Sequence, residues 1–373
     1  MSANKHPKRR KKTNKKTKLL SIIAAILFLI SIVLLVIYFA DIKKEVDNKK
    51  TNSETTITKK LEVFDEDSNK RPIAVMLDTN IGNQSHAGLQ DSYLNYEIIV
   101  EGGLTRIMAI FKDKDVSLIG PVRSSRHYFL DYALESDCIY THYGWSTYAE
   151  NDIKNLNVDN INGLYDDEVF WRDKTIAAPH NVFTSIERNY SYATKKDYKQ
   201  TSNNWKLLKY STDEIELNTP ISVKKQKNPE TGKVETVENT NPELLNATSV
   251  ILPYSYYQTR SYTYDQNRGV YLRYMNNEPH VDKTTKQQLY YKNIIIEFVS
   301  NQTIDSYGRQ DLDTVGTGKG YYITKGYALP INWTKSSRND KTKYTYSDGK
   351  EITVNDGNTF IQIIPSTSNI TLE

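Results

Sequence analysis

The longest hydrophobic run of the chain lies near its amino terminus. Residues 19–40 form a stretch of 22 residues without a charged side chain. As a helix this stretch is roughly 33 Å long, which is enough to cross a hydrocarbon core of about 30 Å. It is longer than the apolar region of a signal peptide, and no small-residue cleavage pattern comes before Asp41. The pattern therefore predicts an uncleaved transmembrane helix at residues 19–40.

The two flanks of this run differ in charge. Residues 1–18 contain nine Lys and Arg residues and no acidic residue, and the positive-inside rule places such a tail in the cytoplasm. Residues 41–70 are polar and charged, which is the composition of a flexible linker. We therefore expect a single-pass type II protein of the cell membrane, with the body that follows residue 70 outside the cytoplasm.

In residues 71–202, continuous apolar runs alternate with segments whose apolar residues recur at helical spacing, and this pattern predicts a mixed α/β domain. A first strand is expected over Arg71–Asp78. Two further apolar runs, joined by Glu101-Gly102-Gly103, predict a hairpin with a tight glycine turn. Apolar residues at helical spacing over 129–134 predict a helix, and Cys138–His142 predicts another strand.

The pattern changes after residue 202. The periodic signal weakens over residues 203–246, so we expect a variable connection there. Within it, residues 224–241 carry much charge and Val as the only apolar residue type, so we expect this part to be dispensable. Residues 247–373 contain β-branched and tyrosine-rich runs separated by turn sequences such as Asp348-Gly349, which predicts a mainly β domain. The expected fold class is α+β, preceded by one transmembrane helix.

The net charge of the whole chain hides a difference between the tail and the body. Beyond the basic tail, 40 Lys and Arg residues face 45 Asp and Glu residues, so the remainder carries a net charge of about −5. Nucleic-acid binding requires clustered bases on the contact face, so no nucleic-acid partner is expected. Cys138 is the only cysteine, which excludes a disulfide within the chain and a lipid-accepting cysteine near the amino terminus.

Glu101 is the candidate catalytic residue. It follows an apolar strand and precedes two glycines, whose lack of side chains lets a ligand approach. Burial against the strand would raise its pKa toward that of a general acid. The alternative is a carboxylate that bonds only to backbone N–H groups of the turn. Glu97 lies about 13 Å away along the same strand, which is too far for a catalytic pair.

Arg123 and Arg126 are the candidate residues for binding an anion. They come just before the predicted helix, where guanidinium groups beside free backbone N–H groups favour a carboxylate or phosphate. Ion pairs with Asp131 or Glu135 along the helix are the alternative. One serine of Ser124-Ser125 is expected to cap the helix.

Four more side chains are expected to bind the substrate: His142 at a strand end, Arg172, and the His180-Asn181 pair after a proline. Of these, His142, His180 and Asn181 would bond the sugar or orient the acid, and Arg172 is also an arginine that a phosphotransferase could use. The histidines lack metal-ligand spacing and no Gly-x-Ser-x-Gly motif is present, so neither a metal site nor a serine hydrolase is expected, and no cofactor. Aromatic side chains that stack on sugar rings, or pack in a core, are available at Tyr143, Trp145, Tyr165, Trp171 and Trp333.

Five motifs in order along the chain resemble the YerB-like family of lipoproteins, which carries the label domain of unknown function 3048. They are Arg71 to Met76, Tyr96 to Gly103, Gly120 to Arg126, Ala178 to Asn181, and Pro279 to Asp282. The resemblance covers about residues 71–365 and implies an extracytoplasmic protein of Gram-positive bacteria in two parts. Members are often lipid-anchored, whereas this chain has an expected transmembrane helix instead. The resemblance implies no activity.

Three function classes fit a body tethered outside a membrane, where peptidoglycan glycan is the expected partner. The first is cleavage of glycan strands by a lytic transglycosylase type of reaction with Glu101 as acid and base, which needs no second carboxylate because the sugar's own 6-hydroxyl attacks. The second is a non-catalytic wall-binding or scaffold protein. The third is a phosphotransferase that attaches teichoic acids, for which more arginines and an acidic metal site near Arg123 are expected.

Overall fold

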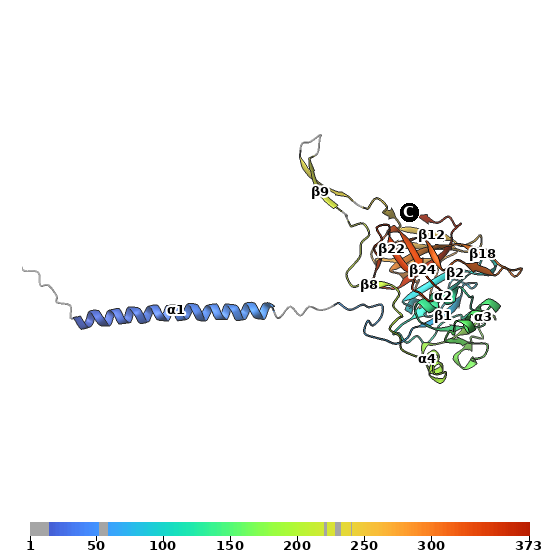
Figure 1. The fold of residues 1–373 in the computed structure, drawn as a ribbon, viewed down its shortest axis with the longest axis horizontal. Helices are drawn as coiled ribbons and strands as arrows, with labels where there is room; N and C mark the ends of the chain where they lie inside the picture. The colour runs from blue at the N-terminus through green and yellow to red at the C-terminus, as the bar shows by residue number, and fades with distance from the viewer. Residues whose placement is uncertain (1–14, 52–58, 220–221, 228–232, 240) are drawn as a thin grey trace, which may run out of the picture. The chain divides into compact units, whose positions relative to one another are not determined.

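The computed structural model describes residues 15–51, 59–219, 222–227, 233–239 and 241–373. The chain divides into two compact units, residues 1–59 and residues 60–373, and we call the second unit the body. The described part of the first unit is one long helix, α1 (Lys15–Thr51), drawn in blue in Figure 1. Most of the predicted basic tail, residues 1–14, lies outside the described residues.

Helix α1 contains the predicted transmembrane run. Its segment Ile22–Lys44 is long and apolar enough to cross a membrane, by length and composition. The predicted linker at residues 41–70 is wrong at both ends. Residues 41–51 continue the helix, since they include no Pro or Gly that would stop it. Val63 and Phe64 are buried in the core of the body, where the ring of Phe64 contacts Trp205 at a centroid distance of 4.8 Å.

The body is organised by one large sheet that contains strands from both halves of the chain. The order of its strands is β11-β21-β20-β17-β24-β2-β3-β1-β4-β5, and β22 pairs with β21. The two halves join where β2 and β24 run parallel, with Leu94 opposite Thr359. The strands are β1 (Ile73–Asp78), β2 (Leu94–Ile99), β3 (Thr105–Phe111), β4 (Ile139–His142), β5 (Asn160–Asn162), β11 (Leu245–Asn246), β17 (Asn293–Val299), β20 (Gly316–Thr324), β21 (Tyr327–Lys335), β22 (Lys343–Tyr346) and β24 (Thr359–Pro365).

A smaller antiparallel sheet of order β15-β14-β13-β12-β25 packs on the large one, and β16 pairs with β14. Aromatic rings form this contact, since the rings of Tyr291 and Phe360 lie 4.9 Å apart and those of Tyr262 and Phe360 lie 6.4 Å apart. Its strands are β12 (Ser249–Pro253), β13 (Thr259–Asp265), β14 (Val270–Met275), β15 (Glu278–Pro279), β16 (Tyr290–Tyr291) and β25 (Thr371–Leu372).

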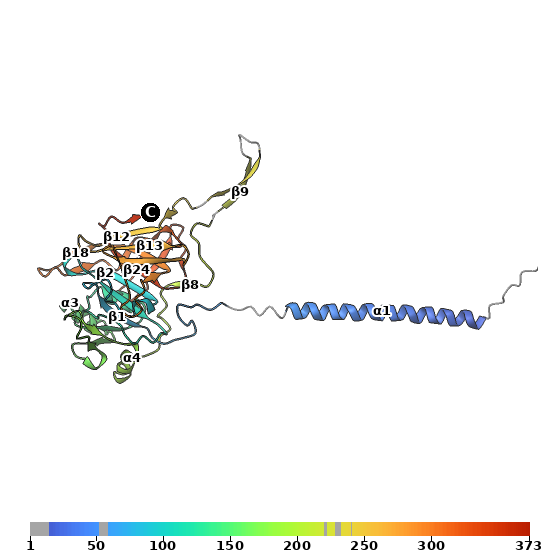
Figure 2. The same ribbon diagram turned by 180° about the vertical axis from the view of Figure 1, so that it is seen from behind.

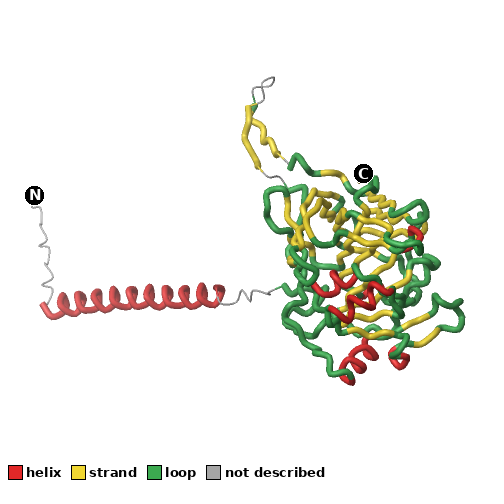
Figure 3. The backbone as a smooth tube through the Cα atoms, turned by 45° about the vertical axis from the view of Figure 1, so that its right-hand side comes forward, coloured by secondary structure: helices red, strands yellow, loops and turns green. Residues whose placement is uncertain are grey.

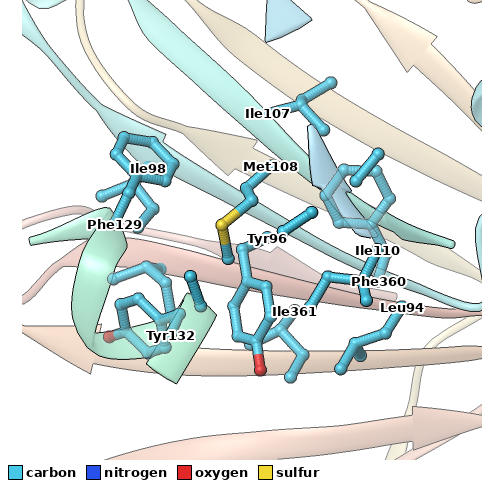
Figure 4. Close-up of a cluster of buried hydrophobic side chains, with 14 of the residues drawn as sticks. Leu94, Tyr96, Ile98, Ile107, Met108, Ile110, Phe129, Tyr132, Phe360 and Ile361 are labelled. Atoms are coloured by element: carbon cyan, nitrogen blue, oxygen red, sulfur yellow. The ribbon is translucent and has the colours of Figure 1, made fainter. Parts of the chain in front are cut away.

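The helices that the structure describes in the body all belong to its N-terminal half (Figure 2), and Figure 3 draws them in red. Helix α2 places Phe129 and Tyr132 over β2, and the rings of Tyr96 and Tyr132 are 4.8 Å apart (Figure 4). Every residue of β2 is buried because both faces of the sheet are covered there. The helices are α2 (Phe129–Glu135), α3 (Thr147–Asn155) and α4 (Ile186–Lys195), with 3-10 turns η1 (Leu89–Asp91), η2 (Glu101–Gly103) and η3 (Asp167–Val169).

The predicted variable connection at residues 203–246 is wrong for its first part. Trp205, Leu207 and Leu208 are buried, and β8 (Lys209–Ser211) pairs with β23 (Thr353–Asn355). The charged part forms a separate two-stranded hairpin of β9 (Ser222–Lys227) and β10 (Val234–Asn239), while residues 220–221, 228–232 and 240 lie outside the described residues. The remaining pairs are β6 (Trp171–Arg172) with β7 (Val182–Phe183), and β18 (Asn301–Thr303) with β19 (Gln310–Leu312).

The predicted elements of the N-terminal half are confirmed with small shifts. The expected strands appear as β1 and β4, the glycine hairpin as β2 and β3, and the expected helix as α2. Gly102 and Gly103 have φ values of 68° and 70°, a left-handed conformation that favours glycine and makes this tight turn possible. The fold class predicted from the sequence, α+β with one apolar helix before it, is confirmed.

Candidate functional site

The strand directions place the carboxyl ends of four strands at one edge of the large sheet, which we call the carboxyl edge. Strands β1, β4 and β5 run parallel, and β1 and β2 are both antiparallel to β3. Asp78 therefore ends β1 at the same edge where Glu101 follows β2, and Arg106 lies at the start of β3. In open sheets with parallel strands, this is the edge where ligands usually bind.

An arginine cluster lies at the carboxyl edge, and we define it as Arg106, Arg123 and Arg126. Arg126 binds Glu101 with two parallel hydrogen bonds, of 2.5 Å from Nε to Oε1 and 2.7 Å from Nη2 to Oε2. The Nε atom of Arg123 lies 3.0 Å from Oδ2 of Asp78, although its N–H is not directed along that line. The loop after β3 thus brings both predicted anion-binding residues to this edge.

Arg106 makes this cluster electrostatically unusual. Its guanidinium donates to the backbone carbonyl of Ser124 and forms no ion pair with any carboxylate that the structure describes. Burial, together with the nearby charges of Arg126 and Arg123, lowers the pKa of Arg106 to about 9 against the opposing effect of Glu101. Three guanidinium groups thus face two carboxylates, which leaves one positive charge for an anion to neutralise.

The predicted raised pKa of Glu101 is wrong. Burial does act to raise it, but the hydrogen bonds and the charge of Arg126 outweigh burial, so the pKa of Glu101 is lowered. Ionised and held by two bonds, this carboxylate has a side chain that is 21% exposed. It is therefore poorly suited to donate a proton in this conformation, and its role here is to position Arg126.

His180 stands beside the arginine cluster. Its Nδ1 atom lies 2.6 Å from Oδ2 of Asp78, and its side chain is 26% exposed. Asp78 holds the ring in one orientation, and the other ring nitrogen, Nε2, has no hydrogen-bond partner among the described residues. An oriented imidazole with one open nitrogen can bind a hydroxyl group or carry a proton.

The other two predicted loop residues are brought together next to His180. Arg172 donates to Oδ1 of Asn181 at 2.7 Å and to the hydroxyl of Tyr143 at 3.2 Å. Asn181 in turn donates to the backbone carbonyl of Asp173, whose carboxylate bonds Lys283 at 2.7 Å. Arg172 is exposed, so a ligand at the carboxyl edge can reach it.

His142 is placed away from any ligand, which corrects the prediction that it binds a sugar. The ring is fully buried, with Nδ1 2.8 Å from the carbonyl oxygen of Gly144 and Nε2 3.2 Å from Oδ1 of Asn160. Burial lowers its pKa to about 4. His142 therefore holds the neighbouring strand ends in place as a neutral ring.

The predicted serine cap is also wrong. Helix α2 begins only at Phe129, and its capping residue Tyr128 makes no side-chain hydrogen bond to the helix. The hydroxyl of Ser124 instead donates to the carbonyl of Tyr143, and that of Ser125 accepts from Tyr140. The serines fasten the loop that carries the arginine cluster to β4.

The alternative ion pairs of the arginines are wrong as well. Asp131 binds Arg338, and Glu135 binds Lys335, and both of these cations belong to the C-terminal half. The two acidic residues therefore join the halves of the body.

Sequence reasoning missed the buried polar network beneath this edge. Glu97 lies 2.7 Å from Nε of Arg260 and 2.5 Å from Nη2 of Arg273, and all three side chains are fully buried. The Nε of Arg273 donates to His280 at 3.0 Å, so Nε2 of His280 is the donor toward His86 across 2.8 Å. The position of Glu97 inside an apolar strand could have indicated this network, because a buried carboxylate requires a cation as its partner.

A partly buried aromatic ring, Trp145, and an exposed one, Tyr165, flank the arginine cluster. The rings of Trp145 and Tyr165 lie 5.8 Å apart, and Tyr165 is 71% exposed. Trp145 follows Gly144, where an added Cβ would lie 3.1 Å from Oγ of Ser124, so these rings neighbour the loop of the cluster. Among the described residues, no group of three or more His, Cys, Asp or Glu side chains is placed to hold a metal ion. The edge offers cations, one open imidazole nitrogen and aromatic faces.

Comparisons with known proteins agree with the architecture. Residues 57–199 match the N-terminal domain, and residues 250–361 the C-terminal domain, of the protein family of unknown function DUF3048. The chain is 30% identical over 298 residues to "Putative lipoprotein YerB" of Bacillus subtilis (strain 168), covering 79% of this chain and 82% of that protein. It is also similar to the crystal structure of YerB protein from Bacillus subtilis, with a TM-score of 0.66, 27% identity, and coverage of 81% of this chain and 94% of that chain. This chain therefore belongs to the YerB-like DUF3048 family.

Proposed function

We propose that this chain is a membrane-anchored protein of the cell envelope that binds peptidoglycan glycan at the carboxyl edge. An apolar helix suited to a membrane and a relative named as a lipoprotein both support attachment to a membrane. The observation that carries the binding proposal is the arginine cluster at the carboxyl edge, in which the buried Arg106 and the partly exposed Arg123 and Arg126 face two carboxylates.

The chemistry of the wall glycan complements this edge. Its muramyl units carry a carboxylate, on the lactyl group or on the attached peptide, which Arg123 can bind as a charge-assisted hydrogen-bond donor. Its sugar rings present apolar faces to Trp145 and Tyr165, and its hydroxyl groups can bond to Nε2 of His180. Non-catalytic binding is favoured over cleavage through Glu101, because Arg126 keeps that carboxylate ionised.

We further propose a single-pass type II topology, with the body outside the cytoplasm. A protease added to intact cells stripped of their wall is then expected to remove the body, because a body outside the cytoplasm is open to the protease. Immunoblotting of the cells before and after lysis measures this. A body that is digested only after lysis contradicts the topology.

The binding proposal predicts that Arg123→Gln weakens binding of the detergent-solubilised full chain to purified wall sacculi. Loss of a charge-assisted hydrogen bond is expected to lower the affinity roughly tenfold or more, as measured by co-sedimentation. The matched control is Arg268→Gln, which removes the same charge from an exposed turn between β13 and β14. Equal affinities of the parent chain and Arg123→Gln contradict a role for the arginine cluster.

A further inference from the structure

Exposed tyrosines gather around the carboxyl edge. Tyr148, Tyr165, Tyr256, Tyr257 and Tyr307 are 40%, 71%, 95%, 67% and 78% exposed, and they are the exposed large aromatic side chains among the described residues of the body. Large aromatic side chains that cluster on a solvent-exposed surface indicate a binding site for a partner or ligand. Their positions form two groups, one on each side of the arginine cluster.

The first group is Tyr165 with its neighbour Trp145. These rings come after the strand ends of β5 and β4, next to Ser124, whose backbone carbonyl accepts from Arg106. This group therefore belongs to the side of the cluster that is formed by the parallel strands of the N-terminal half.

The second group comes from two loops of the C-terminal half that close around the Glu101–Gly103 turn. In the loop between β12 and β13, Ser255 donates to the carbonyl of Gly103 at 2.6 Å, and the rings of Tyr256 and Tyr257 lie 5.2 Å apart. In the loop between β18 and β19, a Cβ added to Gly308, the residue after Tyr307, would lie 4.0 Å from the backbone nitrogen of Gly102. Both tyrosine loops thus contact the turn that carries the partner of Arg126.

Arg309 and Tyr148 connect this second group to the cluster. The pKa of Arg309 is raised mainly by its hydrogen bond of 2.7 Å to Asp305. The charges of Glu101 and Tyr148 raise the pKa of Arg309 further, so Glu101 and Tyr148 lie close to Arg309. Tyr148 lies on α3, and its ring is 5.6 Å from that of His127. Figures 1 and 2 show α3 and the β18 hairpin on the same side of the body.

We infer that the carboxyl edge binds an internal stretch of a glycan chain, with sugars stacked on both tyrosine groups and a carboxylated sugar between them on the arginine cluster. The inference rests on the proposed function and extends the bound ligand from one anionic group to several consecutive sugars of a polymer. The exposed rings are interrupted by charged groups such as Arg309 and Glu101, so they do not make the continuous apolar patch typical of a protein interface. A polysaccharide alternates apolar ring faces with hydroxyl and carboxylate groups and so matches this pattern.

The test compares a muramyl disaccharide with longer fragments of wall glycan as ligands of the detergent-solubilised full chain. In calorimetry, the parent chain is expected to bind long fragments at least about tenfold more tightly than the disaccharide. The double substitution Tyr256→Ala with Tyr257→Ala is expected to remove this gain and leave the disaccharide affinity unchanged. Both residues are highly exposed, so the melting temperature should stay the same.

The controls separate this inference from the proposed function. Leu245→Ala removes an exposed apolar side chain from β11 and is expected to leave every affinity unchanged. Arg123→Gln should weaken the disaccharide and the long fragments alike. If the parent chain binds the disaccharide and long fragments equally, the polymer site is overturned while the binding proposal stands. If the parent chain binds neither ligand, both proposals are overturned.

Discussion

Glu97→Gln is expected to lower the free energy of unfolding of the body by about 3–5 kcal/mol. The carboxylate of Glu97 lies between Arg260 and Arg273, with Thr105 donating at 2.6 Å as a third partner. Burial acts to raise its pKa, but the two arginines outweigh burial and lower the pKa to about 2. The neutral amide leaves two fully buried guanidinium groups without a counter-charge, and that is the source of the loss.

Chemical denaturation of the parent and the variant measures this loss. Glu150→Gln is the matched control, because Glu150 pairs with Lys154 at 2.8 Å on the surface of α3, where such pairs contribute about 0–1 kcal/mol. Since Glu97 belongs to β2 while Arg260 and Arg273 belong to β13 and β14, the variant also weakens the joint between the two sheets. A variant that unfolds at the same denaturant concentration as the parent would show that this network does not stabilise the body.

The sequence predicts structure that depends on residues close together along the chain, and it does not predict contacts between residues that are far apart along the chain. The hairpin of β2 and β3 is predicted because its apolar runs and two glycines are adjacent. The ion-pair partners of Glu97 are not predicted, because Arg260 and Arg273 lie 163 and 176 residues away from Glu97 along the chain. Strand periodicity says that a buried carboxylate needs a cation, but it does not say which one.

The ion pairs of the arginine cluster are also not predicted by the sequence, although the residues involved are closer together along the chain. Helical spacing favours Asp131 as a partner of Arg126, yet α2 begins only after Arg126. The loop is free to turn toward Glu101, 25 residues earlier in the chain. Two histidines near strand ends or prolines likewise look equivalent in sequence, but the fold buries His142 and leaves His180 half-buried beside Asp78. Residue type predicts the chemistry available at the edge, and the fold decides which side chains reach it.

Burial produces a second unusual carboxyl group, in Glu297 on β17. It is fully buried, accepts from Tyr132 at 3.0 Å and from Tyr344 at 2.8 Å, and lies near the charge of Glu135. Burial and the charge of Glu135 raise the pKa of Glu297 to about 7, against the opposing hydrogen bonds of the two tyrosines. In the unfolded chain its pKa returns to the ordinary value of 4.5.

The stability of the body is therefore expected to fall between pH 4.5 and about 7 through this group. In that window the folded state holds a proton on Glu297 that the unfolded state has lost, so the contribution is complete below pH 4.5 and is lost as the pH rises through 7. A shift from 4.5 to about 7 corresponds to about 3 kcal/mol. Glu297→Gln mimics the protonated form, because an amide can accept from one tyrosine and donate to the other.

Melting temperatures of the parent and Glu297→Gln at pH 5 and pH 8 measure this contribution. The parent is expected to lose more stability over this range than the variant, and the variant is expected to be the more stable of the two at pH 8. The exposed carboxyl variant Glu150→Gln controls for a change in net charge and should keep the pH dependence of the parent. Groups remote from Glu297 contribute equally to both curves, so the difference between the two curves reports on Glu297 and its immediate surroundings. Parallel curves would mean that Glu297 is ionised in the folded body, with Lys335 rather than a proton balancing its charge.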